Sequence, residues 1–380
     1  MKKLILFIAY LAISQISAGQ IVSGSFVHDN IIRNFDLHLP TGWTSNDSLP
    51  LLLDFHYLGA DGRDEDTLTQ FNPIADVEGF IVCHPWGFFS DWNVGQNAPF
   101  GSGTKDVDYI NVLIDTLHSR YGIDLNRVYA VGMGQGGFMV HRLACELSGR
   151  LAAVAAVGAS IADSAAFYCQ TTRPVPVMMI QGTADSVIYY YTGLPGIWGS
   201  VQQLVNLWKA HNNALGNEIT VNLPDTANEG SHIISHRWLG DQNSEVLLYE
   251  VVNGGFAWPG ANRDLGSGGN RNMDINASRH IWDFLKRYTL TTFTPIGMEE
   301  TVDVDLQMNV FPNPAKELLH VSVSTGKLPN VKVLDLQGRE AFAPITFQTG
   351  NSADVNVSHL PNGMYLLQAD GVSKRFAVMH

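Results

Sequence analysis

The sequence predicts an α/β domain, with a mostly parallel sheet and helices on both faces, followed by a small C-terminal β-sandwich. Short apolar runs alternate with segments whose apolar residues recur every three or four positions. This alternation is typical of buried parallel strands joined by crossover helices. After Tyr288 a linker-like segment follows, and from about Met308 the chain has short alternating strands separated by turns such as Asn-Pro and Asn-Gly, which indicates a β-sandwich. The 380 residues exceed the length of one typical domain, so two domains are expected.

The elements of the first domain can be placed in order along the chain. The predicted strands are residues 49–57, 79–87, 128–134, 175–185 and 245–255, and the predicted helices are residues 104–122, 200–213 and 276–288. In the first of these helices, apolar residues from Val107 to Tyr121 form one buried stripe. Sites in such sheets lie at the carboxyl ends of the strands, so the residues that follow each strand are the candidates.

The composition excludes nucleic acid as the main partner. Acidic residues outnumber basic residues by 36 to 23, which gives a formal net charge of −13 at pH 7. This charge repels phosphate backbones and anionic membrane surfaces. Apolar residues make up 45% of the chain, which is enough for a sizeable core and excludes disorder throughout.

Residues 1–19 are a predicted secretory signal peptide. Two lysines precede an apolar stretch from Leu4 to Ile13, and small residues follow up to Gly19, the expected cleavage position. The stretch is shorter than the ~20 residues that a membrane-spanning helix needs, and no later segment is long enough. We therefore expect an exported protein with no integral membrane segment.

Three cysteines in an exported chain allow one disulfide and one free thiol, and their spacing leaves the pairing open. Cys83 lies in an apolar run and is the expected buried thiol.

A glycine-rich motif joins the strand at 128–134 to a helix, and two chemistries compete for it. Read as G-x-G-x-x-G, the stretch from Gly132 to Gly137 would hold a pyrophosphate. That site also needs an acidic residue at the end of the next strand, which instead ends in Ala159 and Ser160. The motif also lies mid-chain, after at least two strands. We therefore predict no dinucleotide and no other cofactor.

Read as a nucleophile elbow, G-x-S-x-G, the same motif has Gly134 where the serine belongs. Gly132 and Gly136 let the strand turn sharply into the helix, and Gln135 would present its backbone amide to an oxyanion. Glycine removes the attacking oxygen and also relieves the strain of that backbone position.

The two other members of a hydrolytic triad would follow as an acid and then a histidine. Asp185 stands in a turn after a buried strand, which is the place of the acid. The histidine would follow the last long strand, where the sequence has Phe256 and no histidine within ten residues on either side. A phenylalanine accepts no proton and activates no nucleophile.

Residues 25–288 resemble the secreted polyhydroxybutyrate depolymerase, feruloyl esterase and acetylxylan esterase branch of the α/β-hydrolase fold. The motifs that carry the resemblance are PLLLDFH, GFIVCHPWG with DWN, DLNRVYAVGM-x-x-GGFMVHRLACE, RPVPVMMIQGTAD, and GG-x-x-WPG followed by MDINAS. The resemblance implies serine at Gly134, aspartate at Asp185, histidine at Phe256, and glycine at Tyr57, where a loop amide completes the oxyanion hole. It also implies a disulfide between Cys145 and Cys169.

The chain therefore departs from the family at the nucleophile, at the base and at one wall of the oxyanion hole. Because Phe256 and Tyr57 also depart from the family, natural decay of the whole site explains Gly134 better than a single engineered Ser→Gly change does. Three tryptophans, Trp86, Trp92 and Trp258, either line a groove for sugars or aromatic esters or pack in the core.

The remaining histidines rank low as site residues. His232 and His236 stand four apart in a strand-like segment with no Cys or carboxylate close in sequence, so no metal site is predicted. His56 and His84 flank the expected pocket mouth but lie outside the loop that delivers a catalytic base.

Residues 308–380 resemble the C-terminal sorting domain of type IX secretion, on the segments NVFPNPAKELLHVSV, VKVLDLQGRE, LPNGMYLLQ and KRFAVMH. The resemblance implies that the type IX secretion machinery recognises this domain and carries the protein to the cell surface or beyond. An ordinary β-sandwich binding module is the alternative. Residues 20–288 are then the esterase-like domain and residues 289–307 a linker.

These observations lead to one functional hypothesis and one alternative. The hypothesis is a secreted protein of the carboxylester hydrolase type that has lost its Ser and His, and that binds an extracellular polymer, carbohydrate or aromatic ester with little or no hydrolysis. The alternative is an active serine-type hydrolase that uses unconventional residues such as Ser160 or His84, or an engineered nucleophile mutant.

Overall fold

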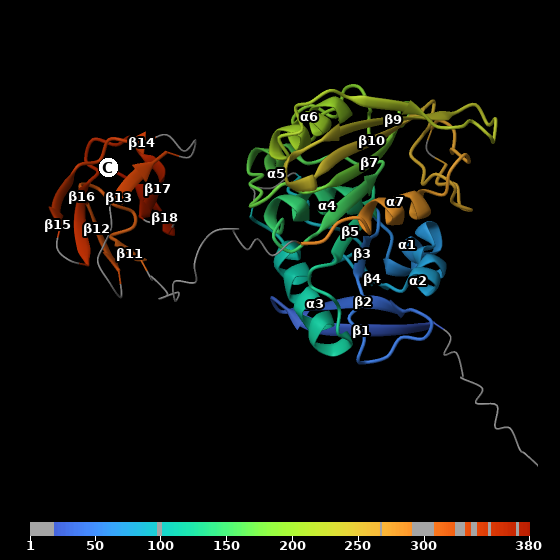
Figure 1. Cartoon of the computed structure of the whole chain (residues 1–380), viewed down its shortest axis with the longest axis horizontal. Helices are drawn as coiled ribbons and strands as arrows, with labels where there is room; N and C mark the ends of the chain where they lie inside the picture. Colours follow the sequence, from blue (N-terminus) through green and yellow to red (C-terminus); the bar gives the residue numbers. More distant parts are fainter. Residues whose placement is uncertain are drawn as a thin grey trace, which may run out of the picture. The chain divides into compact units, whose positions relative to one another are not determined.

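The computed structural model divides the chain into two compact units, residues 1–292 and 293–380 (Figure 1). The structure describes residues 19–96, 101–266, 268–290, 308–323, 331–335, 340–348, 351–369 and 372–380. The predicted signal peptide, apart from Gly19, and residues 291–307 of the predicted linker lie outside the described residues.

The first unit is built on a ten-stranded sheet with the order β1-β2-β4-β3-β5-β6-β7-β10-β9-β8. The strands are β1 (Gln20–His28), β2 (Ile31–Leu39), β3 (Leu51–Phe55), β4 (Ile81–Pro85), β5 (Val128–Met133), β6 (Ala153–Val157), β7 (Val177–Gly182), β8 (Ile219–Asn222), β9 (His232–Leu239) and β10 (Glu245–Val252). The six strands from β4 to β10 in this order are parallel, and the strands at both edges are antiparallel. Figure 1 shows this order, with β1 and β2 at one end and β9 near the other.

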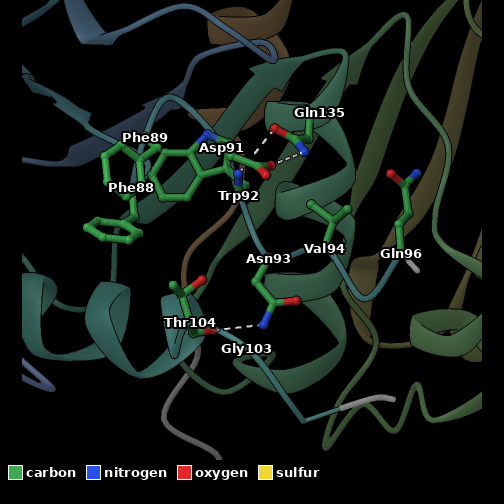
Figure 2. Close-up of a pocket in the computed structure, with 10 residues that line it drawn as sticks. All are labelled: Phe88, Phe89, Asp91, Trp92, Asn93, Val94, Gln96, Gly103, Thr104 and Gln135. Atoms are coloured by element: carbon green, nitrogen blue, oxygen red, sulfur yellow. Dashed lines mark hydrogen bonds between the residues drawn. The ribbon is translucent and has the colours of Figure 1, made fainter. Parts of the chain in front are cut away.

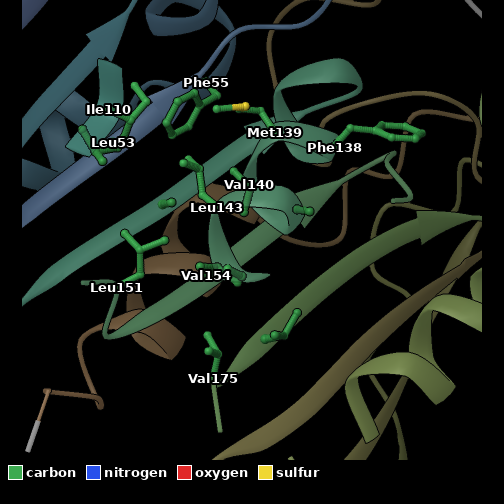
Figure 3. Packing of buried hydrophobic residues seen from close by; sticks show 14 of the residues in the cluster. Leu53, Phe55, Ile110, Phe138, Met139, Val140, Leu143, Leu151, Val154 and Val175 are labelled. Atoms are coloured by element: carbon green, nitrogen blue, oxygen red, sulfur yellow. The ribbon is translucent and has the colours of Figure 1, made fainter. Parts of the chain in front are cut away.

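Helices cover both faces of the sheet. They are α1 (Gly62–Thr69), α2 (Phe71–Glu78), α3 (Asp106–Tyr121), α4 (Gln135–Glu146), α5 (Asp163–Phe167), α6 (Val201–His211) and α7 (Ala277–Leu285). Alternate residues of one strand enter two separate cores: Leu53 belongs to the core under α3, α4 and α6, and Leu52 to the core under α1, α2 and α7. Figure 3 shows part of the first core. This architecture confirms the predicted α/β-hydrolase fold.

The second unit consists of two four-stranded antiparallel sheets with the orders β11-β12-β16-β15 and β14-β13-β17-β18. Their strands are β11 (Met308–Phe311), β12 (Leu318–Val323), β13 (Val331–Leu334), β14 (Glu340–Ala341), β15 (Ile345–Gln348), β16 (Ser352–Asn356), β17 (Gly363–Ala369) and β18 (Val372–Val378). Leu319 and Val355 from one sheet share a buried cluster with Val333 and Phe376 from the other. The shared core confirms a small β domain of the sandwich type.

No described helix is both long and apolar enough to cross a lipid bilayer.

A disulfide joins Cys145, at the end of α4, to Cys169, just after α5, and Cys83 is a buried free cysteine. Replacing both bridged cysteines by serine is expected to lower the free energy of unfolding by about 3 kcal/mol, because the bridge closes a chain segment with a sequence separation of 24. Urea denaturation of the variant and of the oxidised wild type measures this loss. Equal free energies of unfolding, or two free thiols in protein recovered from outside the cell, would contradict the assignment.

Candidate functional site

A sharp turn joins β5 to α4 and places Gly134 at the carboxyl edge of the sheet. Its backbone has φ 52° and ψ −123°, a conformation that is costly for residues with a Cβ. The small residues on either side permit the turn, since a Cβ on Gly136 would lie 2.0 Å from the carbonyl oxygen of Phe55. The backbone therefore makes the sharp strand-to-helix turn that the predicted elbow requires, with glycine at position 134.

The ring of Phe256, which follows β10, lies against Gly134. A Cβ on Gly134 would lie 2.9 Å from Cζ of Phe256 and 3.4 Å from Cβ of Tyr57. The first of these distances is well inside van der Waals contact. A side chain at Gly134, the predicted nucleophile position, would therefore require the Phe256 ring to shift.

Asp185 stands after β7 and is 5% exposed. Its Oδ1 accepts hydrogen bonds from the backbone N–H groups of Val187 (2.7 Å) and Ile188 (2.8 Å). Its Oδ2 is buried and has no hydrogen-bond partner among the described residues. Burial raises the pKa of Asp185 to about 6, although the two backbone hydrogen bonds lower it in part.

Asp185 and Phe256, at the predicted acid and base positions, both lie close to Gly158. A Cβ built on this residue would lie 3.0 Å from the ring of Phe256 and 3.7 Å from Oδ2 of Asp185. The unsatisfied carboxylate oxygen and the phenyl ring therefore border the same small space. Such a buried oxygen is costly without a donor, and an imidazole N–H is the donor that a triad supplies there.

Asp185→Asn tests the state of this carboxyl group through its pH dependence. Because the pKa of Asp185 is raised in the folded protein, its protonated form stabilises the fold fully below about pH 4, and this contribution is lost as the pH rises through about 6. The difference in free energy of unfolding between the variant and the wild type is therefore expected to shift in favour of the variant by about 2–3 kcal/mol when the pH is raised from 4 to 8.

Urea denaturation at both pH values measures the effect. Asp108→Asn, at an exposed position on α3, is the matched control. A difference between variant and wild type that is the same at pH 4 and pH 8 would contradict the raised pKa of Asp185.

Gln135 and Tyr57 are the residues predicted to flank an oxyanion hole. Gln135 is the first residue of α4, where backbone N–H groups have no acceptor within the helix. Its side chain accepts a hydrogen bond from the Trp92 backbone N–H (3.1 Å) and donates one to Asp91. The carbonyl oxygen of Tyr57 accepts from the His56 imidazole (2.9 Å) and from the Ala60 backbone N–H (3.1 Å). Gln135 thus keeps its main chain at the elbow, while Tyr57 adds a bulky side chain opposite it.

These residues border a mostly apolar cavity of about 420 Å³. It is lined by Tyr57, Leu58, Gln96, Gly134, Gln135, Phe138, Val187, Ile188, Trp198 and Phe256. A second cavity of about 370 Å³ shares Gln96 and Gln135 with the first and is more polar. In Figure 2, Phe88 and Phe89 stand together on one side of this second cavity, and Gln135 bonds to Asp91 and Trp92. The two cavities adjoin at Gln96 and Gln135, one mostly apolar and the other more polar, and they are together called the cleft below.

The three predicted tryptophans do not share this cleft. Trp92 lines the second cavity but is only 2% exposed, and its indole N–H donates to the His56 carbonyl oxygen. Trp86 donates to Asp36, and Trp258 donates to Ser278 inside the core. Trp258 thus packs in the core, which is one of the two alternatives for these residues, and neither Trp86 nor Trp258 lines a cavity of the cleft.

Ser160 and His84, the unconventional nucleophile and base of the alternative hypothesis, do not lie at the cavity beside Gly134. Ser160 is 1% exposed and donates to the Gly199 carbonyl oxygen (3.0 Å). His84 is buried with its ring nitrogens 3.4 Å from Asp54 and 3.7 Å from Asp66. Neither residue lines the cavity at Gly134.

Sequence reasoning missed most of the apolar lining of the cleft. Val187 and Ile188 follow the acid by two and three positions and could have been found from that spacing. Phe138 lies one helical turn after Gly134, which is a comparable signal. Trp198 packs edge-on against Phe138 (5.5 Å between centroids) from a loop whose path no local pattern shows.

Among the described residues, one cluster of three acidic side chains is spaced closely enough to hold a metal ion: Asp225, Glu229 and Asp274. Asp274 accepts hydrogen bonds from the backbone N–H groups of Thr226 and Ala227. Asn272 donates to Glu229 and to Asp274. These hydrogen bonds explain why the three side chains lie together: they hold the loop around residues 225–229 against the segment at 272–274.

The two units are similar to different kinds of known protein. Residues 309–377 match the family described as "Secretion system C-terminal sorting domain". The second unit is a secretion sorting domain. The sorting domain directs the protein through type IX secretion to the cell surface or the extracellular space.

The first unit is esterase-like. It is similar to the bifunctional acetylxylan esterase/xylanase XynS20E of Neocallimastix patriciarum, at 30% identity over 42% of this chain and 22% of that protein. It is also similar to feruloyl esterase D of Neurospora crassa, at 25% identity over 67% of this chain and 82% of that protein. Acetyl xylan esterase from Aspergillus awamori aligns in structure with a TM-score of 0.48 and 16% identity, over 63% of this chain and 94% of that one. The chain thus spans about a fifth of the length of the first of these relatives.

Proposed function

We propose that the protein is an exported, esterase-like binder whose cleft holds a polymer, a sugar or an aromatic ester with little or no hydrolysis. The observation that carries this proposal is the arrangement of three positions. Phe256 lies where a base belongs, its ring blocks a side chain at Gly134, and Oδ2 of Asp185 is buried without a partner.

The chemistry of the cleft supports a binder. Acyl transfer by covalent catalysis needs a nucleophile and a group that takes its proton. The described residues that line the apolar cavity include no serine, cysteine, histidine or lysine. The one hydroxyl in this lining belongs to Tyr57, whose pKa is raised by burial, so this phenol is a weak nucleophile without a neighbouring base.

The shape and lining of the cleft suit an ester that joins a ring to a polar group. Phe138, Trp198 and Phe256 supply aromatic surface in the apolar cavity, which a planar ring or a short acyl chain would fill. Asp91, Asn93 and Thr104 border the adjoining cavity and offer hydrogen bonds to hydroxyl groups. The names of the similar esterases, feruloyl and acetylxylan, favour an ester of a saccharide as the ligand. Polyhydroxybutyrate stays a prediction from the sequence resemblance.

We further infer that export removes residues 1–19, that residues 20–288 act as the binding domain, and that residues 289–307 connect it to the sorting domain at 308–380. The partners of this arrangement are the type IX secretion machinery and the extracellular ligand.

Methyl ferulate binding tests the proposed function. We expect the purified protein to bind methyl ferulate saturably, seen as quenching of tryptophan fluorescence, and to release it intact, as chromatography of the mixture shows. Val187→Arg places a long charged side chain at the cavity wall and is expected to weaken binding by about tenfold or more. Val77→Arg, at an exposed position on α2 outside the cleft, is the control and is expected to bind like the wild type. Absence of binding, or steady formation of ferulic acid, would contradict the proposal.

A further inference from the structure

A separate cavity of about 380 Å³ lies over the antiparallel edge of the sheet, between α6 and the strands β9 and β10. Its lining includes Tyr191, Lys209, Glu218, His236, Trp238 and Glu250. It shares no lining residue with the two cavities of the cleft. A ligand here would therefore not touch Gly134, Asp185 or Phe256.

Regular elements build the walls of this cavity. Leu248 of β10 pairs with His236 of β9, so that alternate residues of both strands form the floor on one face of the sheet. Val201, Val205 and Lys209 recur every four residues along α6 and form one wall. A cavity held by a paired sheet and a helix is preorganised, which reduces the entropy cost of binding.

A histidine holds two carboxylates at this floor. His236 lies with Nδ1 2.5 Å from Oε1 of Glu218 and Nε2 3.0 Å from Oε2 of Glu250. The hydrogen bond from His236 lowers the pKa of Glu218, which keeps that carboxylate ionised at neutral pH. The fold brings both carboxylates to His236 from segments that are distant in sequence, which agrees with the absence of a carboxylate close to it in the sequence. Each carboxylate carries a second oxygen that can accept a hydrogen bond.

Aromatic side chains border the same space, and one of them is open to solvent. Tyr191 is 71% exposed and packs against Tyr190 with 4.9 Å between ring centroids. Trp238 is nearly buried, and the ammonium group of Lys209 covers its face at 4.6 Å from the centroid. The free aromatic face at the mouth is therefore that of Tyr191.

We propose that this cavity is a second binding site, for a neutral saccharide. The charges disfavour the alternatives: Glu218 and Glu250 repel an anion, and the ammonium group of Lys209, which covers the Trp238 face, repels a cation. A purely apolar ligand would desolvate both carboxylates without giving them a donor. A sugar ring packs its C–H face on Tyr191 and donates its hydroxyl hydrogens to the two carboxylates. Lys209 and Gln202 donate to its oxygen atoms.

Isothermal titration calorimetry of the purified full chain with xylohexaose, cellohexaose and mannohexaose tests this site. We expect saturable binding of at least one of them. Tyr191→Ala and Glu218→Gln are each expected to weaken that binding by about tenfold, the effect of losing one stacked ring or one charged acceptor. Tyr189→Ala is the matched control, because Tyr189 is 45% exposed, stands two residues away and does not line the cavity.

Saturating methyl ferulate, the probe for the cleft, separates this site from the cleft. We expect it to leave hexasaccharide binding to this cavity unchanged, because the two sites share no lining residue, so that failure of the cleft to bind esters and failure of this site to bind sugars are distinguishable. Two results would overturn the proposal: no binding of any of the three hexasaccharides by the wild type, or equal affinities of Tyr191→Ala, Glu218→Gln and the wild type. Circular dichroism and thermal unfolding of each variant confirm that the fold is retained.

Discussion

Gly134→Ser combined with Phe256→His is expected to give the protein measurable ester hydrolysis, whereas either change alone leaves it near the wild-type rate. A triad acts as a unit, and its loss in serine hydrolases costs on the order of a millionfold in turnover. A serine alone has no base to take its proton. A histidine alone has no hydroxyl group to activate.

Packing gives a second reason for this dependence. A Cβ on Gly134 would lie 2.9 Å from Cζ of Phe256, so the serine needs the phenyl ring to be removed. An imidazole is smaller, and its N–H meets the buried Oδ2 of Asp185, which has no hydrogen-bond partner among the described residues. The same histidine thus makes room for the serine and satisfies the carboxylate.

The oxyanion hole limits the recovered rate. Gln135 still offers its backbone amide at the start of α4, but Tyr57 occupies the position of the other wall. A misplaced second amide costs about 10² to 10³ in rate, so we expect the double variant to remain well below a natural esterase. The measurement is the release of p-nitrophenol from p-nitrophenyl acetate. Adding Asp185→Asn to the double variant is the control and should abolish the gain, whereas full activity of Gly134→Ser alone would contradict the account.

Deletion of residues 308–380 is expected to abolish delivery to the cell surface and to leave the first unit folded. The buried cluster of the sorting domain is made of its own residues, and the two cores of the first unit contain none of them. The first unit should therefore unfold with an unchanged transition.

Fractionation of the native host measures delivery, and calorimetry of the truncated protein measures the transition. The full chain with Phe342→Ala, a change at an exposed position of the sorting domain, is the control for delivery and should still leave the cell. Truncated protein in the medium at wild-type levels would contradict the sorting role.

The elbow could be predicted because its signal is local. Gly132, Gly134 and Gly136 at fixed spacing after a buried strand already indicate a strand-to-helix turn, and the structure has that turn. Asp185 and Phe256 were found in the same way, from their places after the strands that became β7 and β10.

Features that depend on contacts between distant segments could not be predicted. Trp86 and Trp258 are residues of a type that often binds ligands. In the folded protein, however, Trp258 packs in the core and Trp86 donates a hydrogen bond to Asp36. His236 acquires Glu250 only through the pairing of β9 with β10, whose register the sequence does not show. The hairpin of β1 and β2 was missed because its apolar residues form no continuous run.

The rate of ester hydrolysis by the wild type, compared with that of Asp185→Ala, tests the central claim most directly. Both proteins are purified twice and assayed with p-nitrophenyl acetate against buffer. If the cleft binds without catalysis, the acid has no role in turnover, and the two proteins hydrolyse the ester at the same trace rate. A wild-type rate that exceeds the Asp185→Ala rate and survives repurification would show that Asp185 still serves a working catalytic site.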